Sequence, residues 1–290
     1  MYFSIRTLTT WTAPILKCPA VGTVHSSYGK AVNLIFDSGM ASLQPSCSPV
    51  SPLSLITGLN APAFASLPLK KGQTAEILQK EIRIRTDVGN VSFSFSDAET
   101  ADTLLIPSVS EDWKQHIGSA LAESSAGGFR RLFISDKSML PRDDHFLVTD
   151  TARKILSRCD KYWLNGRFVD AASELNRMIG LGIGLTPSGD DFLCGILAGF
   201  ILSGHQDHLF FRSLRKQIAE NLDRTNELSG AFLQCALSSH FSLTVKHLCS
   251  CHTAGETASA FSQIGHSSGM DTLSGIYYAL SLLQKEPEQQ

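Results

Sequence analysis

The first hundred residues alternate apolar and polar side chains with the period of two that β-strands show. Two apolar runs within residues 32–43 flank Asp37-Ser38-Gly39, a pattern that predicts a β-hairpin. Residues 82–95 repeat the pattern around a second turn, with one apolar and one polar face, as in a half-buried antiparallel sheet. The Ser/Pro-rich residues 44–52 between the two hairpins predict a loop.

From about residue 111 the apolar period lengthens to that of an α-helix. Trp113, Ile117 and Leu121 lie on one helical face, and this helix is expected to end at Gly127-Gly128. The pattern of residues 131–149 is ambiguous, and residues 131–134 and 146–148 are candidates for short strands. After Asp150 the pattern is helical nearly to the end. Further helices are expected before the glycines of residues 180–184 and near residues 187–203, 208–223, 227–240, 254–263 and 269–284.

These patterns predict an α+β fold, in which a β-rich N-terminal part built of antiparallel hairpins is followed by an α-helical C-terminal part. We expect residues 1–110 to form the β-rich domain and residues 111–165 a mixed α/β connection. Residues 166–290 would form the helical domain, which carries the glycine-rich motif.

A nine-residue pattern occurs twice in the helical half. Residues 188–196 and 268–276 share the skeleton S-G-x-D-x-L-x-G-I, 80 positions apart. Each copy is typical of a helix start, with a serine at the beginning and an acid in the first turn. Two similar helix N-termini facing one pocket would form a site for an anion, a metal or both.

The first copy follows three alternating glycines, which let a backbone bend and approach a ligand closely. No lysine follows them, so this is not a Walker loop. Free N–H groups and the positive end of the helix dipole attract phosphate or carboxylate. The anion-binding candidates of the two helix starts are Gly182, Gly184, Thr186, Ser188, Gly189, Ser268 and Gly269.

Helix architecture alone is the competing interpretation. Ser188 with Asp191, and Ser268 with Asp271, also fit a capping box, which needs no ligand. Capping leaves Gly195 and Gly275 unexplained, since a glycine inside a helix costs about 1 kcal/mol relative to alanine. Close packing of the two helices would also require these glycines.

The acids of the motif allow a metal interpretation. Asp190, Asp191 and Asp271 are candidate ligands for Mg²⁺, which prefers oxygen donors and often bridges to phosphate. Mg²⁺ is the only cofactor to which the pattern points. Asp191, Asp271 and His266, the last of which directly precedes the second serine pair, are candidate catalytic residues.

Two further segments carry polar side chains of interest. Arg224, Asn226 and Glu227 precede another Ser-Gly pair and are candidates for substrate binding, although a capped helix with a solvated arginine explains them equally well. His247, Cys249, Cys251 and His252 cluster, but their spacing does not match a zinc ribbon. Small buried cysteines near surface histidines are the simpler explanation.

Composition narrows the class of protein. The chain has 290 residues, with 25 Lys and Arg against 27 Asp and Glu, and lacks a long basic run, which argues against nucleic acid as a partner. The most apolar stretch, residues 192–202, is too short for a bilayer span of about 20 residues. Seven irregularly spaced cysteines favour a reducing cytoplasm over a disulfide framework. The low charged fraction of 18% is typical of a surface covered by other subunits.

Three segments together resemble a known bacterial family. They are the motif from Gly182 through Gly184-Leu185-Thr186-Pro187-Ser188-Gly189-Asp190-Asp191-Phe192-Leu193 to Gly195, the segment Asn226-Glu227-Leu228-Ser229-Gly230, and the motif from Gly265-His266-Ser267-Ser268-Gly269 to Gly275. Ala31-Val32-Asn33-Leu34 fits as well. The chain is similar to the AllH-like subunit of bacterial oxamate (oxalurate) carbamoyltransferase.

The resemblance implies a carbamoyltransferase of anaerobic allantoin breakdown, within purine catabolism and nitrogen metabolism. Such an enzyme converts oxalurate and phosphate to oxamate and carbamoyl phosphate. It is a heteromer of three different subunits, so the other subunits and a small anionic substrate would be the partners. The resemblance carries over no catalytic residue. Two alternatives remain open: a non-catalytic scaffold subunit, and a stand-alone Mg²⁺-dependent hydrolase using Asp190, Asp191 and Asp271.

Overall fold

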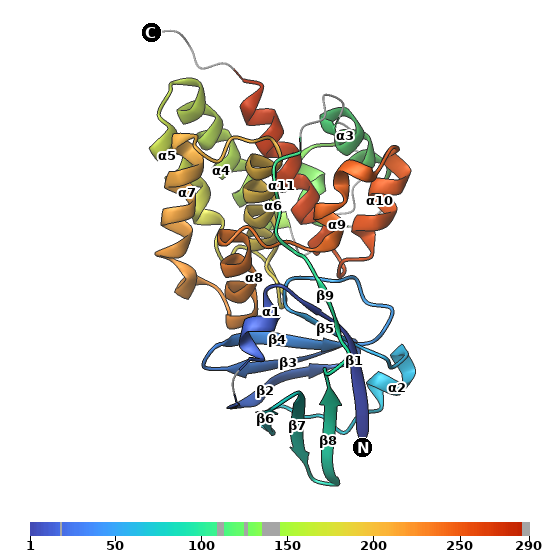
Figure 1. Cartoon of the computed structure of the whole chain (residues 1–290). Coiled ribbons are helices and arrows are strands. Elements are labelled where there is room, and N and C mark those ends of the chain that lie inside the picture. The colour runs from blue at the N-terminus through green and yellow to red at the C-terminus, as the bar shows by residue number, and fades with distance from the viewer. Residues whose placement is uncertain (18, 109–112, 125–126, 135–145, 286–290) are drawn as a thin grey trace. The chain divides into compact units, whose positions relative to one another are not determined.

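A computed structural model describes residues 1–17, 19–108, 113–124, 127–134 and 146–285. The chain divides into two compact units. One comprises Met1–Leu104 with His240–Leu243, and the other comprises Leu105–Ser239 with Thr244–Gln290. Figure 1 colours both units from the N-terminus to the C-terminus.

The first unit is a closed β-barrel. Around the barrel the strands run in the order β5-β4-β3-β2-β6-β7-β8-β1, and pairing of β1 with β5 closes the ring, while β9 flanks β1. The strands are β1 (Tyr2–Thr9), β2 (Ala20–Tyr28), β3 (Ala31–Phe36), β4 (Gly39–Gln44), β5 (Ser54–Thr57), β6 (Thr74–Leu78), β7 (Glu81–Thr86), β8 (Gly89–Ser94) and β9 (Glu99–Ala101). Two short helices, α1 (Thr12–Ile15) and α2 (Ala61–Ala65), lie in the connections.

The closed barrel corrects the prediction of simple antiparallel hairpins. Both predicted hairpins are present, as β3 with β4 and β7 with β8. However, β1 pairs in parallel with β8 and β9, and β4 pairs in parallel with β5. Period-two alternation shows which face of a strand is buried, but it does not reveal pairings between strands far apart in sequence. The ring closure was therefore missed, although the order of a β part followed by a helical part holds.

Alternating side chains fill the barrel. Val32 and Leu34 of β3, Ile82 of β7 and Phe93 of β8 are almost completely buried. Their inward direction follows from the strand period, because every second residue faces the same side of the sheet. The polar Asn33 is also buried, and its side-chain amide donates to Ser26 Oγ at 2.9 Å.

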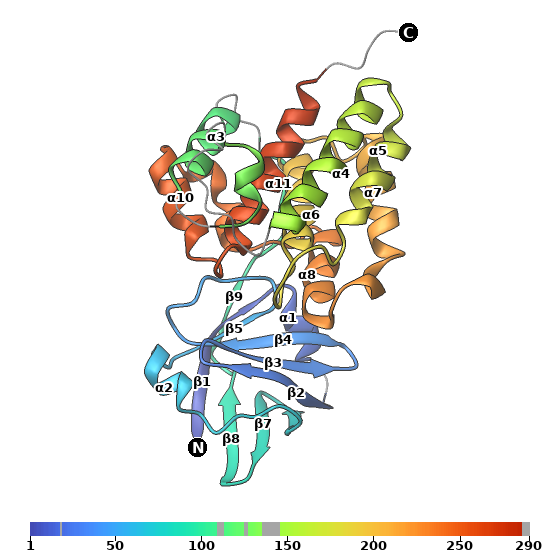
Figure 2. The same ribbon diagram turned by 180° about the vertical axis from the view of Figure 1, so that it is seen from behind.

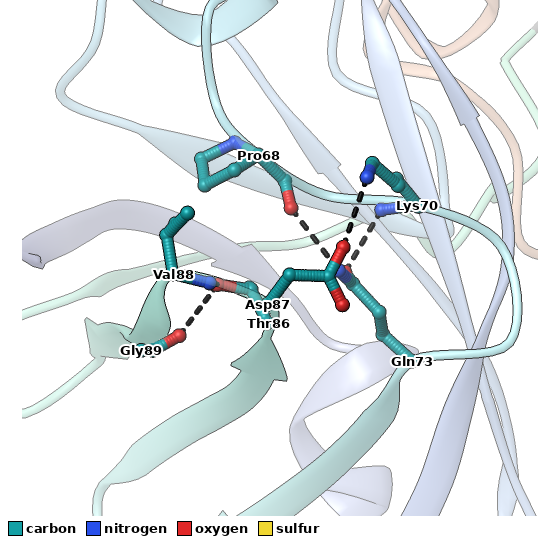
Figure 3. A network of polar contacts seen from close by, with 7 residues as sticks. All are labelled: Pro68, Lys70, Gln73, Thr86, Asp87, Val88 and Gly89. Atoms are coloured by element: carbon teal, nitrogen blue, oxygen red, sulfur yellow. Dashed lines mark hydrogen bonds and ion pairs between the residues drawn. The ribbon is translucent and has the colours of Figure 1, made fainter.

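The predicted turn between β7 and β8 is held by polar contacts at the surface (Figure 3). Thr86 Oγ1 donates to the carbonyl of Gly89, and the Lys70 ammonium lies 2.9 Å from Asp87 Oδ2. Gln73 accepts from the Lys70 N–H and donates to the carbonyl of Pro68. These groups are exposed, so the ion pair contributes at most about 1 kcal/mol.

The second unit is helical. Its longer helices are α3 (Trp113–Glu123), α4 (Phe146–Leu164), α5 (Phe168–Leu175), α6 (Ser188–Leu202), α7 (Leu209–Ala219), α8 (Glu227–Leu237), α10 (Ala254–Ser262) and α11 (Ser268–Leu283). Short helical turns are η1 (Gly128–Leu132), η2 (Asn176–Met178), η3 (Leu222–Arg224), α9 (Leu243–Lys246) and η4 (Leu248–Ser250).

Helices α6 and α11 form the centre of the second unit. Both views show them side by side, with α4, α5 and α7 on one flank and α3 and α10 on the other (Figures 1 and 2). Every residue of α6 except Asp191 and Cys194 is buried. A helix that is apolar on all sides is typical of the middle of a bundle.

The short strands predicted at residues 131–134 and 146–148 are wrong. Residues 128–132 form the turn η1, and α4 begins at Phe146. Residues 135–145 lie outside the described part of the chain. Apolar runs of three or four residues do not distinguish a strand from a helix end, so tertiary packing decides them. Phe133, for example, stacks on Phe192 of α6 with 6.3 Å between ring centroids.

Candidate functional site

The two copies of the repeated motif meet at their N-terminal ends. Thr186, two residues before α6, forms a 2.8 Å hydrogen bond through its Oγ1 with Oγ of Ser268, the first residue of α11. The two helices run parallel from this point, because Gly195 lies against Gly275 and, one turn later, Gly199 lies against Ala279. The structure thus brings together two helix starts that lie 80 positions apart in sequence.

The glycines inside the helices are explained by packing. A Cβ atom added at Gly195 would lie 2.0 Å from the carbonyl oxygen of Thr272, and one added at Gly275 would lie 2.1 Å from that of Phe192. Positions 192 and 272 are themselves equivalent in the repeat. The contact is therefore reciprocal, and each helix needs its glycine so that the other can approach.

The glycines at the helix starts are also structural. A Cβ added at Gly189 would lie 2.1 Å from the Met178 carbonyl oxygen, and one at Gly269 would lie 1.9 Å from that of Phe261. Their N–H groups donate to the carbonyls of Leu181 and Ile264 at 2.8 and 3.0 Å. These two N–H groups are engaged within the protein and are not free to bind an anion.

The serines do not cap the helices. Pro187 occupies the N-cap position of α6 and Ser267 that of α11, and neither supplies a side-chain capping bond. Ser188 and Ser268 are instead the first helical residues. The capping-box interpretation is wrong here, because a capping serine must stand one position before the helix. Local capping therefore does not account for the Ser268 hydroxyl.

Asp190 is a positioning residue. The side chain is buried, and its Oδ1 accepts from the Gly180 N–H at 2.8 Å. Its Oδ2 accepts from the hydroxyls of Thr225 at 2.5 Å and Ser229 at 2.7 Å. Asp190 thus ties the start of the glycine loop and α8 to α6. The sequence interpretation missed Thr225 and Ser229, although their i, i+4 spacing at a helix start was a usable signal.

Asp191 turns toward α11. The residue as a whole is half-buried, but its Oδ2 is sealed from solvent and has no hydrogen-bond partner among the described residues. Burial raises the pKa of the Asp191 carboxyl well above its ordinary value, and the negative charge of Asp271 raises it further. Hydrogen bonding by the Ser268 and Thr186 hydroxyls opposes this pKa shift in part. The raised pKa favours the neutral form of the Asp191 carboxyl, which can donate a proton.

Asp271 is the equivalent acid of α11 and is completely buried. Its Oδ1 accepts the N–H of Phe129 at 2.6 Å. The preceding Gly128 has φ +80°, and a Cβ there would lie 2.3 Å from Asp271 Oδ1. Only a glycine at this position fits the turn that presents the Phe129 N–H. The sequence interpretation used Gly127 and Gly128 as a helix stop and missed this role.

The remaining candidates lie around this centre or serve other contacts. Ser188 is buried, while the loop glycines Gly182 and Gly184 have φ +146° and +111°. His266 is exposed just before α11. Asn226 is the N-cap of α8, where its Oδ1 accepts from the Ser229 N–H at 3.0 Å. Arg224 and Glu227, on either side of it, are exposed.

The structure gives the metal interpretation little geometric support. Within the described residues, no group of three or more His, Cys, Asp or Glu side chains is arranged to hold a metal ion. The trio Asp190, Asp191 and Asp271 is divided, because Asp190 is used for hydrogen bonds to the loop and α8. Cys251 of the histidine-cysteine cluster contacts the His247 carbonyl at 3.9 Å.

Comparison with known families gives two matches. Residues 178–280 match the family described as oxamate carbamoyltransferase subunit AllH, and residues 5–100 match the AllH family N-terminal domain. The first match covers α6, α8 and α11, and the second covers most of the barrel. The chain belongs to the AllH family.

Membership in the AllH family confirms the resemblance drawn from the repeated motif. A family described as a subunit implies further subunits in a transferase complex. No solved structure matches this AllH chain. No helix of the described residues is long and apolar enough to cross a membrane.

Proposed function

We propose that this AllH chain supplies an acid-bearing substrate site to a carbamoyltransferase that converts oxalurate and phosphate to oxamate and carbamoyl phosphate. The observation that carries the proposal is the junction of α6 and α11. There the Thr186 and Ser268 hydroxyls meet beside Asp191, whose Oδ2 is buried and has no hydrogen-bond partner in the described structure. Buried polar atoms are rarely left without a partner, so a ligand is a reasonable explanation.

The reaction fits a neutral acid at this position. A phosphate oxygen attacks the carbamoyl carbon of oxalurate, a bond from that oxygen to the carbon forms, and the bond from the carbon to the oxalyl-linked nitrogen breaks. The departing nitrogen needs a proton to leave as the amide of oxamate. Asp191, whose neutral form is favoured by burial and by the charge of Asp271, would supply it. The hydroxyls of Thr186 and Ser268 would hydrogen-bond to the oxygen that gains negative charge, a contribution of about 3 kcal/mol per donor.

A neutral Asp191 also removes a difficulty of the anion-site prediction. Both substrates are anions, and an ionised carboxylate in the site would repel them. A protonated carboxyl instead donates a hydrogen bond to an anion. The site then needs no cation between acid and substrate. The exposed His266, directly before α11, would add positive charge near the entrance when protonated.

We place the complex in the cytoplasm. The six described cysteines Cys47, Cys159, Cys194, Cys235, Cys249 and Cys251 are all free. Free thiols in this number are typical of a reducing compartment. The other subunits of the complex would complete or cover the site, in agreement with the low charged fraction of 18%.

The test is a carbamoyl phosphate–forming assay on the chain assembled with its partner subunits. Asp191→Asn, Thr186→Val and Ser268→Ala keep the side-chain shape and are assayed after assembly is verified by size-exclusion chromatography. The expected result is a loss of about 100-fold in kcat for Asp191→Asn and for each hydroxyl variant. Ser262→Ala on α10 removes an exposed hydroxyl that bonds to the Ala258 carbonyl and serves as the control.

A scaffold subunit remains the second candidate, and one observation favours it. The glycines Gly189, Gly195, Gly269 and Gly275 are all accounted for by close packing. Wild-type kcat in all three assembled variants would support the scaffold function and overturn the catalytic one. Loss of activity confined to the three site variants would overturn the scaffold function.

A further inference from the structure

A second pocket lies at the opposite end of α11 from the candidate site. It has a volume of about 810 Å³, within the range of small-molecule sites. Its walls come from α3, α4, α11 and the residues that follow η1. With a rise of about 1.5 Å per residue, the length of α11 puts this pocket roughly 20 Å from Ser268.

The described charged side chains that line the pocket are mostly basic. Lys114, Arg153, Lys161 and Lys285 face a single acid, Asp160. Asp160 is already engaged, because its Oδ1 accepts from the Tyr278 hydroxyl at 2.7 Å and its Oδ2 lies 2.7 Å from the Lys285 ammonium. Arg153 lies 3.8 Å from Asp150, so the excess of positive charge remains mainly with Lys114 and Lys161.

Two of these cations lie close enough to repel each other. Burial lowers the pKa of Lys114, and the positive charge of Lys285 lowers it further. The Lys114 ammonium donates to Gln284 Oε1 at 2.6 Å, a neutral partner that does not offset its charge. A polyvalent anion between the two ammonium groups would relieve this repulsion.

The pocket also has an apolar lining. It consists of Leu132, Phe133, Leu156 and Leu164, together with the ring of Tyr278. Phe133 is held in place by ring contacts with Tyr277 at 5.5 Å and Tyr278 at 6.3 Å between centroids. A flat aromatic group can pack on these apolar side chains, while the lysines bind the charged part of the same ligand.

We propose that this pocket binds a nucleoside phosphate, with the phosphates against Lys114, Lys161 and Arg153 and the base against Phe133 and its apolar neighbours. The combination of basic and apolar lining residues fits a ligand with a charged and a flat uncharged half. Neither inorganic phosphate nor an uncharged nucleoside would contact both kinds of residue. The proposal is independent of the reaction at the α6–α11 junction.

A ligand bound in this pocket would contact a segment that also contacts the candidate site. Phe133 lines the pocket and stacks on Phe192, the residue after Asp191. Phe129, four residues earlier, donates its N–H to Asp271. The segment 129–133 thus contacts the pocket, Asp271 and the residue that follows Asp191.

The experiment is calorimetric titration of the full chain with ADP, adenosine and inorganic diphosphate. ADP is expected to bind at least about tenfold more tightly than either fragment, because only ADP contacts both the basic and the apolar residues. The double variant Lys114→Gln/Lys161→Gln is expected to weaken ADP binding about tenfold or more. The control is Lys154→Gln. Lys154 lies on α4, as Lys161 does, but it pairs with Asp150 and does not line the pocket.

Circular dichroism verifies that the variants are folded. If the double variant does not fold, the exposed single change Arg153→Gln gives a second measurement of ADP binding. The absence of ADP binding at millimolar concentration would overturn the proposal. Diphosphate that binds as tightly as ADP, or equal weakening by Lys154→Gln, would also overturn it, since binding would then be unspecific attraction to surface charge.

Discussion

Gly195 of α6 and Gly275 of α11 each occupy the space that a side chain on the other would need. A Cβ built on either glycine would lie 2.9 Å from the Cα of the other. The helices therefore touch backbone to backbone about two turns after their starts. This contact sets the separation of the two helix N-termini, and with it the distance between the Thr186 and Ser268 hydroxyls.

A methyl group at this contact should separate the helices. Gly195→Ala and Gly275→Ala are each expected to lower the free energy of unfolding by about 3 kcal/mol, measured by urea denaturation, because the added carbon meets a carbonyl oxygen. Gly255→Ala on α10 is the control, since an added Cβ there meets nothing within 4 Å. This control should be neutral or stabilising by up to about 1 kcal/mol. Equal effects at Gly195 and Gly255 would contradict the packing explanation.

Two neighbouring glycines at the start of η1 should respond differently to alanine. Gly128 has φ +80° and lies against Asp271, whereas Gly127 has φ −72° and open space around its Cα. Gly128→Ala is expected to destabilise the chain by about 3 kcal/mol in thermal or urea unfolding, since it combines backbone strain with a clash. Gly127→Ala should change stability by less than about 0.5 kcal/mol. Equal stability of the two variants would show that the Phe129–Asp271 contact does not fix this turn.

Asp190 should matter for stability rather than for chemistry. Asp190→Ala leaves one N–H and two hydroxyl groups without their acceptor, for an expected loss of about 4 kcal/mol in the free energy of unfolding. Ser229→Ala and Thr225→Val each remove one donor and should cost about 1–2 kcal/mol. Double-mutant cycles between Asp190 and each hydroxyl measure the coupling. Strict additivity of the changes would disprove the hydrogen-bonded cluster.

The raised pKa of Asp191 predicts the sign of a pH dependence. Above the ordinary carboxyl pKa the unfolded chain loses the Asp191 proton while the folded chain keeps it, so stability falls as pH rises toward the folded-state pKa. This one group contributes a slope of up to about 1.4 kcal/mol per pH unit between those two values. Asp191→Asn should remove that slope, so its stability relative to wild type should increase from pH 5 to pH 8. Parallel stability curves for both proteins would mean that Asp191 is ionised in the folded state.

The sequence predicted the elements of this site better than their roles. Period and turn residues located the β3–β4 and β7–β8 hairpins and the start of α6. The repeat correctly indicated that Ser188 and Ser268 belong to two similar helix starts. It did not show that Gly189 and Gly269 are packed against preceding carbonyls, because those contacts come from the fold of the loops.

What the sequence missed depends on contacts between distant segments. Closure of the barrel by β1 and the contact of Phe129 with Asp271 join residues without any local pattern. The different contacts of Asp190 and Asp191 were also missed. The two are adjacent in sequence, but a helix turns about 100° per residue, so one faces α8 and the other α11.

The reciprocal glycine contact has a consequence for how the chain acquires its site. The two helices are separated by 80 positions, so their approach closes a long loop that contains α7, α8 and α10. Such non-local closure carries an entropic cost and is slow compared with helix formation. A nascent chain that has completed α8 holds Asp190 in its hydrogen bonds but has no partner for Thr186. The acid pair comes into existence only with the last helix, which makes its assembly a late event of folding.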